Sequence, residues 1–247
     1  MSTFAVAAEF SRALGGVDNP VALGSLLADA AKVTGCRYFA LSHHIDFAAS
    51  GGDGIRIHNY PDEWVDWFDT RSLGVSDPIH RASHQTAIAF RWAEVSTLIT
   101  LTRGDEIVLE AAGRHGIGGG FTVPANVPGE ARGSCSFAAE GAMGVTDEHL
   151  ALAQIVGLFA FEAARRLSYS RTPNRHARLT DRQRECVLWV ARGKTDWEIA
   201  QILGVSHSTI IEHVRHARER YGTTNRLVLT VRAIFDGTLC FSDVIGR

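Results

Sequence analysis

Chemistry-bearing residues gather most clearly in the C-terminal third of the chain, on one side of an expected helix. Ile210, Val214 and Ala217 recur at helical spacing, so they form the buried face of a helix that runs to about Tyr221. Polar and basic groups with one isoleucine follow the opposite face, namely His207, Ser208, Ile211, Glu212, Arg215 and Arg218. Such side chains can contact base edges in the major groove of DNA. The pattern predicts a DNA-reading helix.

A shorter helix and a tight turn are expected to position this reading helix. Thr195 and Glu198 have the spacing of a capping box at the start of a helix over 196–203. A turn follows, and either Ser206 or Ser208 caps the reading helix. This order of elements is a helix-turn-helix, which places its second helix in the major groove. The same arrangement also occurs in helical bundles that bind nothing.

The run from Gly193 to His213 resembles the DNA-binding domain of LuxR-type transcription regulators. Two residues depart from the family pattern, because Gln183 stands where Glu is usual and Val187 where Leu is usual. We expect both to repack the first helix without removing DNA binding. The matching residues are Gly193, Lys194, Thr195, Glu198, Ile199, Ala200, Ile202, Leu203, Gly204, Val205, Ser206, Thr209 and His213.

The resemblance also implies individual roles in DNA binding. Arg215 falls where the family presents a base-reading arginine, and Arg can address guanine O6 and N7 together. Ile211 is expected to meet a thymine methyl group, and Lys194, Arg218 and Arg220 are expected to touch phosphates. The predicted DNA-binding set is Lys194, His207, Ser208, Thr209, Ile211, Glu212, Arg215, Arg218 and Arg220.

Charge divides the chain into two parts with different tasks. Residues 171–247 hold 13 Lys/Arg against 8 Asp/Glu, a net charge of +5, whereas residues 1–170 hold 12 against 19, a net charge of −7. A basic domain suits a phosphate backbone, and an acidic one does not. Residues 168–178 are polar, contain Pro173 and lack apolar periodicity. We therefore expect a signal-binding domain over 1–167, a linker over 168–178 and a DNA-binding domain over 179–247.

Composition places the chain among globular cytoplasmic proteins. A length of 247 residues, 45% hydrophobic and 21% charged, fits two domains of ordinary size. No run of about 18 apolar residues and no signal-peptide layout is present, so neither a membrane span nor export is expected. The four cysteines lack any CxxC pairing and are expected to be buried thiols in a reducing cytosol. They are Cys36, Cys135, Cys186 and Cys240. The protein is therefore expected in the cytoplasm, associated with the nucleoid.

The first domain is expected to be an α/β fold, an α–β–α sandwich with a mainly antiparallel sheet. Strands are expected over 36–45, 55–60, 120–124 and 134–140. Helices are expected over 20–33, from Pro61 through Trp67, within 95–113, and from Thr146 to about 167. Helices before and after such a sheet favour the sandwich. The second domain is expected to be an all-α four-helix helix-turn-helix domain, whose last helix spans 225–235.

This first domain also resembles the acyl-homoserine-lactone-binding domain of LuxR-type proteins. The resemblance rests on the joint spacing, since Asp-Pro follows a series of three aromatic residues four apart, and a further Trp and a strand Ser come later in the chain. One departure is Phe68, where the family usually has Tyr, so a hydroxyl group is missing there. The predicted ligand-binding set is Tyr60, Trp64, Phe68, Asp77, Trp92 and Ser136.

These residue types suit an acyl-homoserine lactone. Trp64 can donate its indole N–H to the lactone carbonyl, and an ionised Asp77 can accept from the amide N–H. Tyr60 and Ser136 can donate to the amide carbonyl, and flat walls are expected from Trp92 and Phe68. The acyl tail is expected among apolar residues such as Phe39, Leu41, Trp67, Val108 and Leu109.

Taken singly, each of these residues also has a structural interpretation. A Trp on a helix face is most often core, and Asp77 before Pro78 is a common turn or helix cap. The glycine-rich segment 115–120 lacks the Lys-Ser/Thr of a phosphate-binding loop and is expected to enter a strand. The histidines lack metal-binding spacing, so His43, His44, His80 and His84 are expected to be surface or capping groups, and no metal or cofactor is expected.

Together these features predict a ligand-responsive transcription regulator of quorum sensing. It is expected to bind an acyl-homoserine lactone and a palindromic double-stranded DNA operator as a homodimer, with RNA polymerase as a further partner. Two rivals stay open at this point. One is a phosphorylation-controlled response regulator with the same DNA-binding domain, although the first domain lacks a doubly wound βα repeat. The other is a lactone-processing enzyme, for which no nucleophile or metal motif is present.

Overall fold

The computed structural model describes residues 3–47, 54–128, 130–141, 146–169 and 178–245. The chain forms two compact units, one over Met1–Asn126 and Ala131–Pro173 and the other over Val127–Glu130 and Asn174–Arg247. Most of the predicted linker lies outside the described residues, so the boundaries at 167 and 179 stay predictions.

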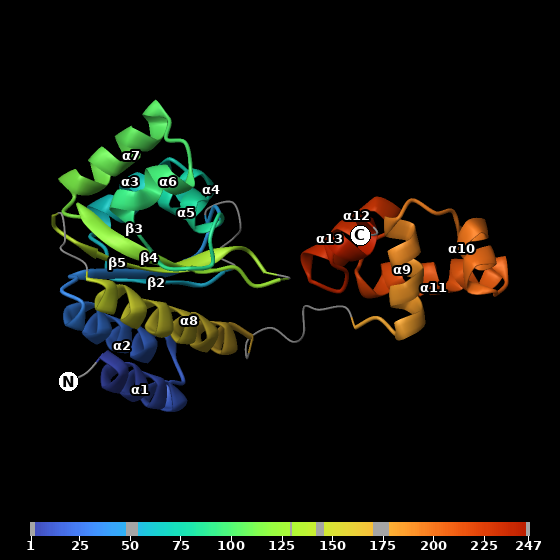
Figure 1. The fold of residues 1–247 in the computed structure, drawn as a ribbon, viewed down its shortest axis with the longest axis horizontal. Coiled ribbons are helices and arrows are strands. Elements are labelled where there is room, and N and C mark those ends of the chain that lie inside the picture. Colours follow the sequence, from blue (N-terminus) through green and yellow to red (C-terminus); the bar gives the residue numbers. More distant parts are fainter. Residues whose placement is uncertain (1–2, 48–53, 129, 142–145, 170–177, 246–247) are drawn as a thin grey trace. The chain divides into compact units, whose positions relative to one another are not determined.

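The first unit is built on one antiparallel sheet of five strands in the order β2-β1-β5-β4-β3. Helices cover both faces, with α1, α2 and α8 on one and α3 to α7 on the other (Figure 1). This confirms the predicted α–β–α sandwich. The strands are β1 (Tyr38–His43), β2 (Arg56–His58), β3 (Phe90–Arg91), β4 (Gly119–Ala125) and β5 (Gly133–Ala139). The helices are α1 (Thr3–Ala13), η1 (Leu14–Gly16), α2 (Pro20–Val33), α3 (Asp62–Thr70), α4 (Leu73–Ser76), α5 (Pro78–Ser83), η2 (Trp92–Glu94), α6 (Val95–Leu98), α7 (Arg103–Arg114) and α8 (Asp147–Tyr169).

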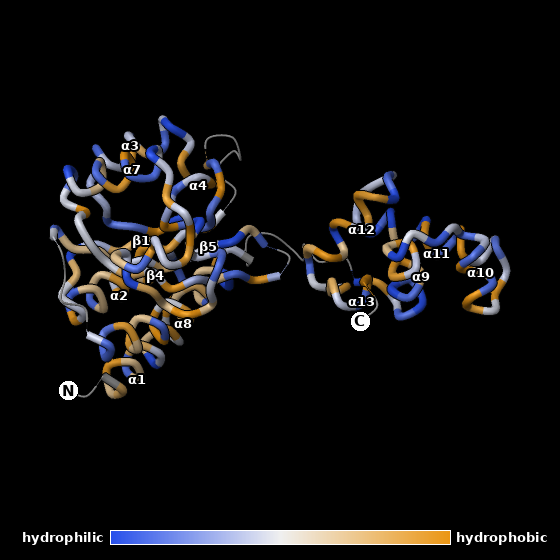
Figure 2. Tube along the Cα trace, turned by 45° about the horizontal axis from the view of Figure 1, so that its top comes forward, coloured by the Kyte–Doolittle hydropathy of each residue, from blue (hydrophilic) through white to orange (hydrophobic). Residues whose placement is uncertain are grey.

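Close packing of α8 and α2 makes one face of the sheet dry. Gly157 of α8 lies against β4 so tightly that a Cβ there would be 2.8 Å from Val123. Asn19 caps α2 by accepting from the backbone N–H of Ala22 at 2.9 Å. Phe121 and Phe137 are almost fully buried on this face. Hydrophobic residues run through these strands and α8 in Figure 2.

The opposite face of the sheet carries shorter helices. The predicted helix within 95–113 is in fact two, α6 and α7, because Ile99 is extended and Thr102 starts a new helix. Thr102 and Asp105 form a capping box, and Arg81 also donates to Asp105 at 2.7 Å. These contacts hold α5 and α7 above the sheet.

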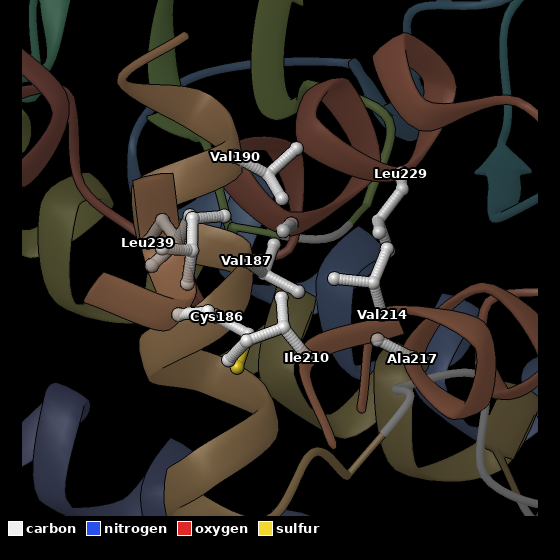
Figure 3. Packing of buried hydrophobic residues seen from close by; sticks show 11 residues of the cluster. Cys186, Val187, Val190, Ile210, Val214, Ala217, Leu229 and Leu239 are labelled. Carbon is white, nitrogen blue, oxygen red and sulfur yellow. The ribbon is translucent and has the colours of Figure 1, made fainter. Parts of the chain in front are cut away.

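Within the described part of the second unit, the chain forms the four expected helices and a short fifth one. They are α9 (Asp181–Ala191), α10 (Asp196–Leu203), α11 (His207–Arg220), α12 (Arg226–Phe235) and α13 (Phe241–Ile245). Ile210, Val214 and Ala217 of α11 are buried as predicted, and Leu229 and Leu239 complete the core (Figure 3).

Helix caps set the turn that gives the motif its name. Thr195 and Glu198 form the predicted capping box, and Gly204 ends α10 in the left-handed region with φ 66°. Ser206, not Ser208, caps α11 by accepting from the backbone N–H of Thr209 at 3.1 Å. Gln183, at the position where glutamate is usual, still forms the capping-box contact, since its side-chain oxygen accepts from the backbone N–H of Thr180 at 3.0 Å.

No helix among the described residues is long and apolar enough to cross a membrane. Three cysteines are buried as predicted, but Cys240 is exposed, so the prediction was wrong for that residue. Its backbone N–H donates to Asp243 just before α13 begins, and the backbone there lies at the surface.

Candidate functional site

A cavity of about 350 Å³ lies between the sheet and the helices α3, α4, α5 and α7. This volume is near the lower end of the range for small-molecule sites, about 300–1,000 Å³. All six residues of the predicted ligand-binding set line the cavity: Tyr60, Trp64, Phe68, Asp77, Trp92 and Ser136. Their role in binding remains a prediction, but the fold brings them together from five separate segments.

The two tryptophans differ in what their indole N–H groups do. Trp92 donates to the Thr122 hydroxyl at 2.9 Å, and that hydroxyl is 2.8 Å from the hydroxyl of Ser136. Trp64 is 94% buried, yet among the described residues its indole N–H has no hydrogen-bond partner. A buried donor without a partner is costly. Of the two, Trp64 therefore has a donor to offer a ligand, while Trp92 supplies a wall.

Asp77 has one committed and one uncommitted carboxylate oxygen. Its Oδ1 caps α5 by accepting from the backbone N–H of His80 at 2.9 Å, and among the described residues Oδ2 has no donor. Burial, and then the nearby Asp77 charge, raise the pKa of Tyr60 far above its ordinary value. The Tyr60 hydroxyl thus stays protonated and can donate.

Phe68 and Trp67 pack around Trp64 in different ways. The ring centroids of Trp64 and Phe68 are 5.7 Å apart, and both residues line the cavity. Trp67 stacks on Trp64 at 5.4 Å but does not line the cavity. The Trp67 ring instead lies under the guanidinium of Arg71, 4.3 Å away.

The predicted tail-binding residues are partly wrong. Val108 and Leu109 line the cavity, but Phe39, Leu41 and Trp67 do not. Successive strand residues point to opposite faces of a sheet, and the neighbours of Phe39 and Leu41 in β1, Ala40 and Ser42, are the ones that face the cavity. Phe39 and Leu41 belong to the dry face instead, where they are nearly fully buried.

Sequence reasoning missed a polar end of the cavity. Its walls include Ser42, His43, Arg56, His58 and His80. Arg56 donates to Asp69 at 2.8 Å, and His58 has a buried Nδ1 without a partner among the described residues. Alternation along β1 and β2 could have pointed to Ser42, Arg56 and His58 once the cavity face was known. The contribution of His80 from α5 has no local sequence signal.

The prediction that the histidines are surface or capping groups was wrong for His44. His44 is 94% buried, its ring stacks on His80 at 3.8 Å, and its Nδ1 is 2.8 Å from Nε2 of His84. Its Nε2 is 2.9 Å from the Ser134 hydroxyl. Burial, followed by the neighbouring histidines, holds the pKa of His44 well below its usual value, so the His44 ring is neutral at pH 7. The described residues include no group of His, Cys, Asp or Glu that could hold a metal ion.

The second candidate site is the outer face of α11. His207, Ser208, Ile211 and Glu212 are exposed along this face, as predicted from the helical spacing. Thr209 is only half exposed, and its hydroxyl lies 2.7 Å from that of Ser206 in the helix cap. Arg215 is held by two carboxylates of its own helix, Glu212 and Glu219, which raise the pKa of its guanidinium.

The basic side chains expected to contact phosphates form hydrogen bonds or ion pairs within the second unit. Arg218 donates to the backbone carbonyl of Thr224 at 3.0 Å, and Arg220 donates to the carbonyl of Arg178. Lys194 lies 3.5 Å from Glu198, one turn into α10. Their DNA contacts stay predictions, and Arg218 in particular fixes the loop after α11.

Comparison with known proteins places both units in one family. Residues 19–167 match the autoinducer binding domain, and residues 177–233 match the bacterial regulatory proteins of the luxR family. The chain is 29% identical over 231 residues to the putative HTH-type transcriptional regulator y4qH of Sinorhizobium fredii, covering 91% of this chain and 70% of that protein. It is 25% identical to the transcriptional activator protein LuxR of Aliivibrio fischeri, covering 88% of each.

The fold agrees with these matches. The crystal structure of Escherichia coli SdiA superposes with a TM-score of 0.74 at 20% identity, covering 96% of this chain and 99% of that one. The matched families and relatives are transcription regulators, not enzymes, so the enzyme and response-regulator hypotheses were both wrong. The chain belongs to the LuxR family of bacterial transcription regulators, which join an autoinducer-binding domain to a helix-turn-helix DNA-binding domain.

Proposed function

We propose that the autoinducer of this regulator is an acyl-homoserine lactone held in the cavity of the first unit. The observation that carries the proposal is the buried indole N–H of Trp64, which lacks a partner among the described residues and lines the cavity together with Asp77. A lactone carbonyl satisfies the indole donor. The ligand amide N–H satisfies the second oxygen of Asp77.

The amide carbonyl of the ligand then lies between two hydroxyl groups, those of Tyr60 and Ser136. Thr122 accepts from Trp92, so its own hydroxyl hydrogen is available to Ser136. That leaves the hydroxyl hydrogen of Ser136 for the ligand. Phe68 and Trp92 form the walls. Because a ligand that binds only the folded state stabilises it by about 2.7 kcal/mol at a hundred times its dissociation constant, the signal also stabilises the domain.

Two matched tryptophan variants test this binding mode. Trp64→Phe removes the donor and should weaken binding of hexanoyl-homoserine lactone roughly 5- to 150-fold, or about 1–3 kcal/mol. Trp67→Phe is the control, because Trp67 packs on Trp64 without lining the cavity, and its affinity should match that of the wild type. Titration calorimetry measures both. Equal loss in both variants, or none in either, would show that the lactone carbonyl does not meet Trp64.

On DNA, the proposal is a cytoplasmic homodimer bound at the nucleoid to a palindromic operator, where it can contact RNA polymerase. Leu227, Val231 and Phe235 recur at every fourth residue of α12 and are 69%, 57% and 55% exposed. Such an apolar helix face supports pairing of two DNA-binding domains. Pairing sets two α11 helices about 34–36 Å apart, in successive major grooves.

The oligomeric state tests the pairing face. Val231→Lys places a charge in the middle of this face and should shift the ligand-bound protein from dimer toward monomer in sedimentation equilibrium. Ile202→Lys on α10 is the matched control, since Ile202 is similarly exposed at 44% and lies outside α12. A monomeric wild type, or a Val231→Lys protein that stays as dimeric as the control, would argue against pairing through α12.

A further inference from the structure

The polar end of the cavity does not suit a purely alkyl chain. Trp64, Tyr60, Phe68 and Trp92 pack in one cluster with Val108, Ala112 and Ile117. The proposed lactone site therefore lies at the α7 side of the cavity. Strand register gives the direction of the acyl group. Ala40 pairs with Ser136 and His58, and two residues further along β1 Ser42 pairs with Ser134 and Arg56. That step is about 7 Å. An acyl group that leaves Ser136 along the strands therefore reaches Ser42 and Arg56.

Arg56 has donors to spare at this end. One of its terminal nitrogens donates to Asp69, and its guanidinium lies 5.0 Å from the ring centroid of Phe47. Among the described residues the remaining guanidinium N–H groups have no acceptor. The side chain is only 23% exposed, so water satisfies these donors less well than at the surface. An alkyl terminus would leave them without a partner.

The charge at this end is already balanced. Asp69 neutralises Arg56, and Asp62 and Asp69 both act on His58. Burial, and then Arg56, lower the pKa of His58, so its ring is neutral and offers one donor and one acceptor nitrogen. Among the described residues, its buried Nδ1 lacks a partner. A hydroxyl group, which both accepts and donates, fits an arginine donor beside a neutral imidazole, whereas a carboxylate would face two aspartates.

Resting on the proposed lactone site, we infer that the acyl group of the signal ends in a hydroxyl group that accepts from Arg56 and lies against His58. The chemical class is an ω-hydroxyacyl-homoserine lactone, aliphatic or phenolic. This assigns Arg56 as a specificity-determining residue. The contacts at the lactone end are the same for every acyl-homoserine lactone. The contacts at the Arg56 end depend on the acyl group and therefore select among signals.

Affinities for matched lactones test the inference. Hexanoyl-, ω-hydroxyhexanoyl- and ω-carboxypentanoyl-homoserine lactone are titrated into the full chain by calorimetry. The hydroxyl-ended lactone should bind about tenfold tighter than the hexanoyl one, the gain of one net hydrogen bond in a largely buried site. Arg56→Met should abolish this preference. Arg71→Met, which changes an exposed arginine directly after α3 that does not line the cavity, should retain it.

The outcomes separate the two proposals. If all three lactones fail to bind, the lactone assignment falls and this inference falls with it. If they bind without preference for the hydroxyl group, or the carboxylate binds tightest, only the inference is overturned. His58→Phe is a second variant in case Arg56→Met does not fold, and it too should lose the preference for the hydroxyl group. The melting temperature of each variant without ligand shows whether it is folded. A preference that survives in both folded variants would also overturn the assignment.

Discussion

Asp77 performs two tasks that can be separated by one pair of substitutions. Its Oδ1 caps α5 through the backbone N–H of His80, and its Oδ2 is the proposed acceptor for the ligand amide. Asp77→Asn keeps an oxygen for the cap but puts an NH₂ donor where the ligand N–H needs an acceptor. Asp77→Ala removes both groups.

The structure sets the size of each effect. In Asp77→Asn the side-chain NH₂ and the ligand amide N–H are two donors that face each other, and neither finds an acceptor at this 94% buried position. This should cost about 1–3 kcal/mol of binding free energy, or roughly 5- to 150-fold in the dissociation constant. Asp77→Asn should show this loss with an unchanged melting temperature without ligand. Asp77→Ala should lose the same affinity and also about 0.5–2 kcal/mol of folding stability, since the helix cap is gone.

Titration calorimetry and thermal unfolding of the ligand-free proteins measure the two effects separately. Wild-type affinity in Asp77→Asn would show that the ligand amide does not donate to the second oxygen of Asp77. A ligand-free Asp77→Asn protein as unstable as Asp77→Ala would show that the side-chain oxygen does not cap α5.

Three further outcomes are expected. Phe68→Tyr should leave the affinity for the lactone unchanged or weaken it, since the ring packs against Trp64 and His80 and a new hydroxyl group must find a partner there. Tighter binding in calorimetry would contradict the prediction that Phe68 is an apolar wall of the cavity. In gel shifts, Arg215→Ala should bind the operator about tenfold more weakly and lose the preference for one base pair of each half-site, because the ion pair with Glu212 is exposed and weak and leaves Arg215 able to contact a guanine. Lys194→Ala should weaken binding to all sequences alike and make it less dependent on salt. If Arg215→Ala instead loses affinity equally for every sequence, Arg215 contacts a phosphate. Burial, then Arg132 and His80, lower the pKa of His84 to about 4, so below pH 6.5 the unfolded chain binds a proton that the folded chain does not bind. The free energy of unfolding, measured in urea, should therefore fall as the pH drops from 6.5 toward 4. An equally steep fall in His84→Gln would assign the effect to other groups.

Local signals explain which helices could be predicted. Asn19 before Pro20 marks the start of α2, and the boxes at Thr180 and Thr195 mark α9 and α10, because caps are formed by residues three positions apart. The break between α6 and α7 carried the same kind of signal at Thr102. An apolar pattern that continues across it concealed the break.

Contacts between distant segments explain what could not be predicted. His44 and His84 meet across forty residues, so nothing near either one indicates that they are in contact or that His44 is buried. The cavity face of β1 depended on which side α2 and α8 would cover, and one face differs from the other by a single residue. Phe39 and Leu41 were therefore placed on the wrong side. The six predicted ligand residues came together because the family spacing already encodes such long-range contacts.

The most direct test is a crystal structure of the protein with hexanoyl-homoserine lactone. We expect the lactone carbonyl within about 2.7–3.2 Å of the indole nitrogen of Trp64 and the ligand amide nitrogen equally close to Asp77 Oδ2, with the acyl group directed toward Arg56. A lactone ring at the Arg56 end, or a ligand bound outside this cavity, would contradict it.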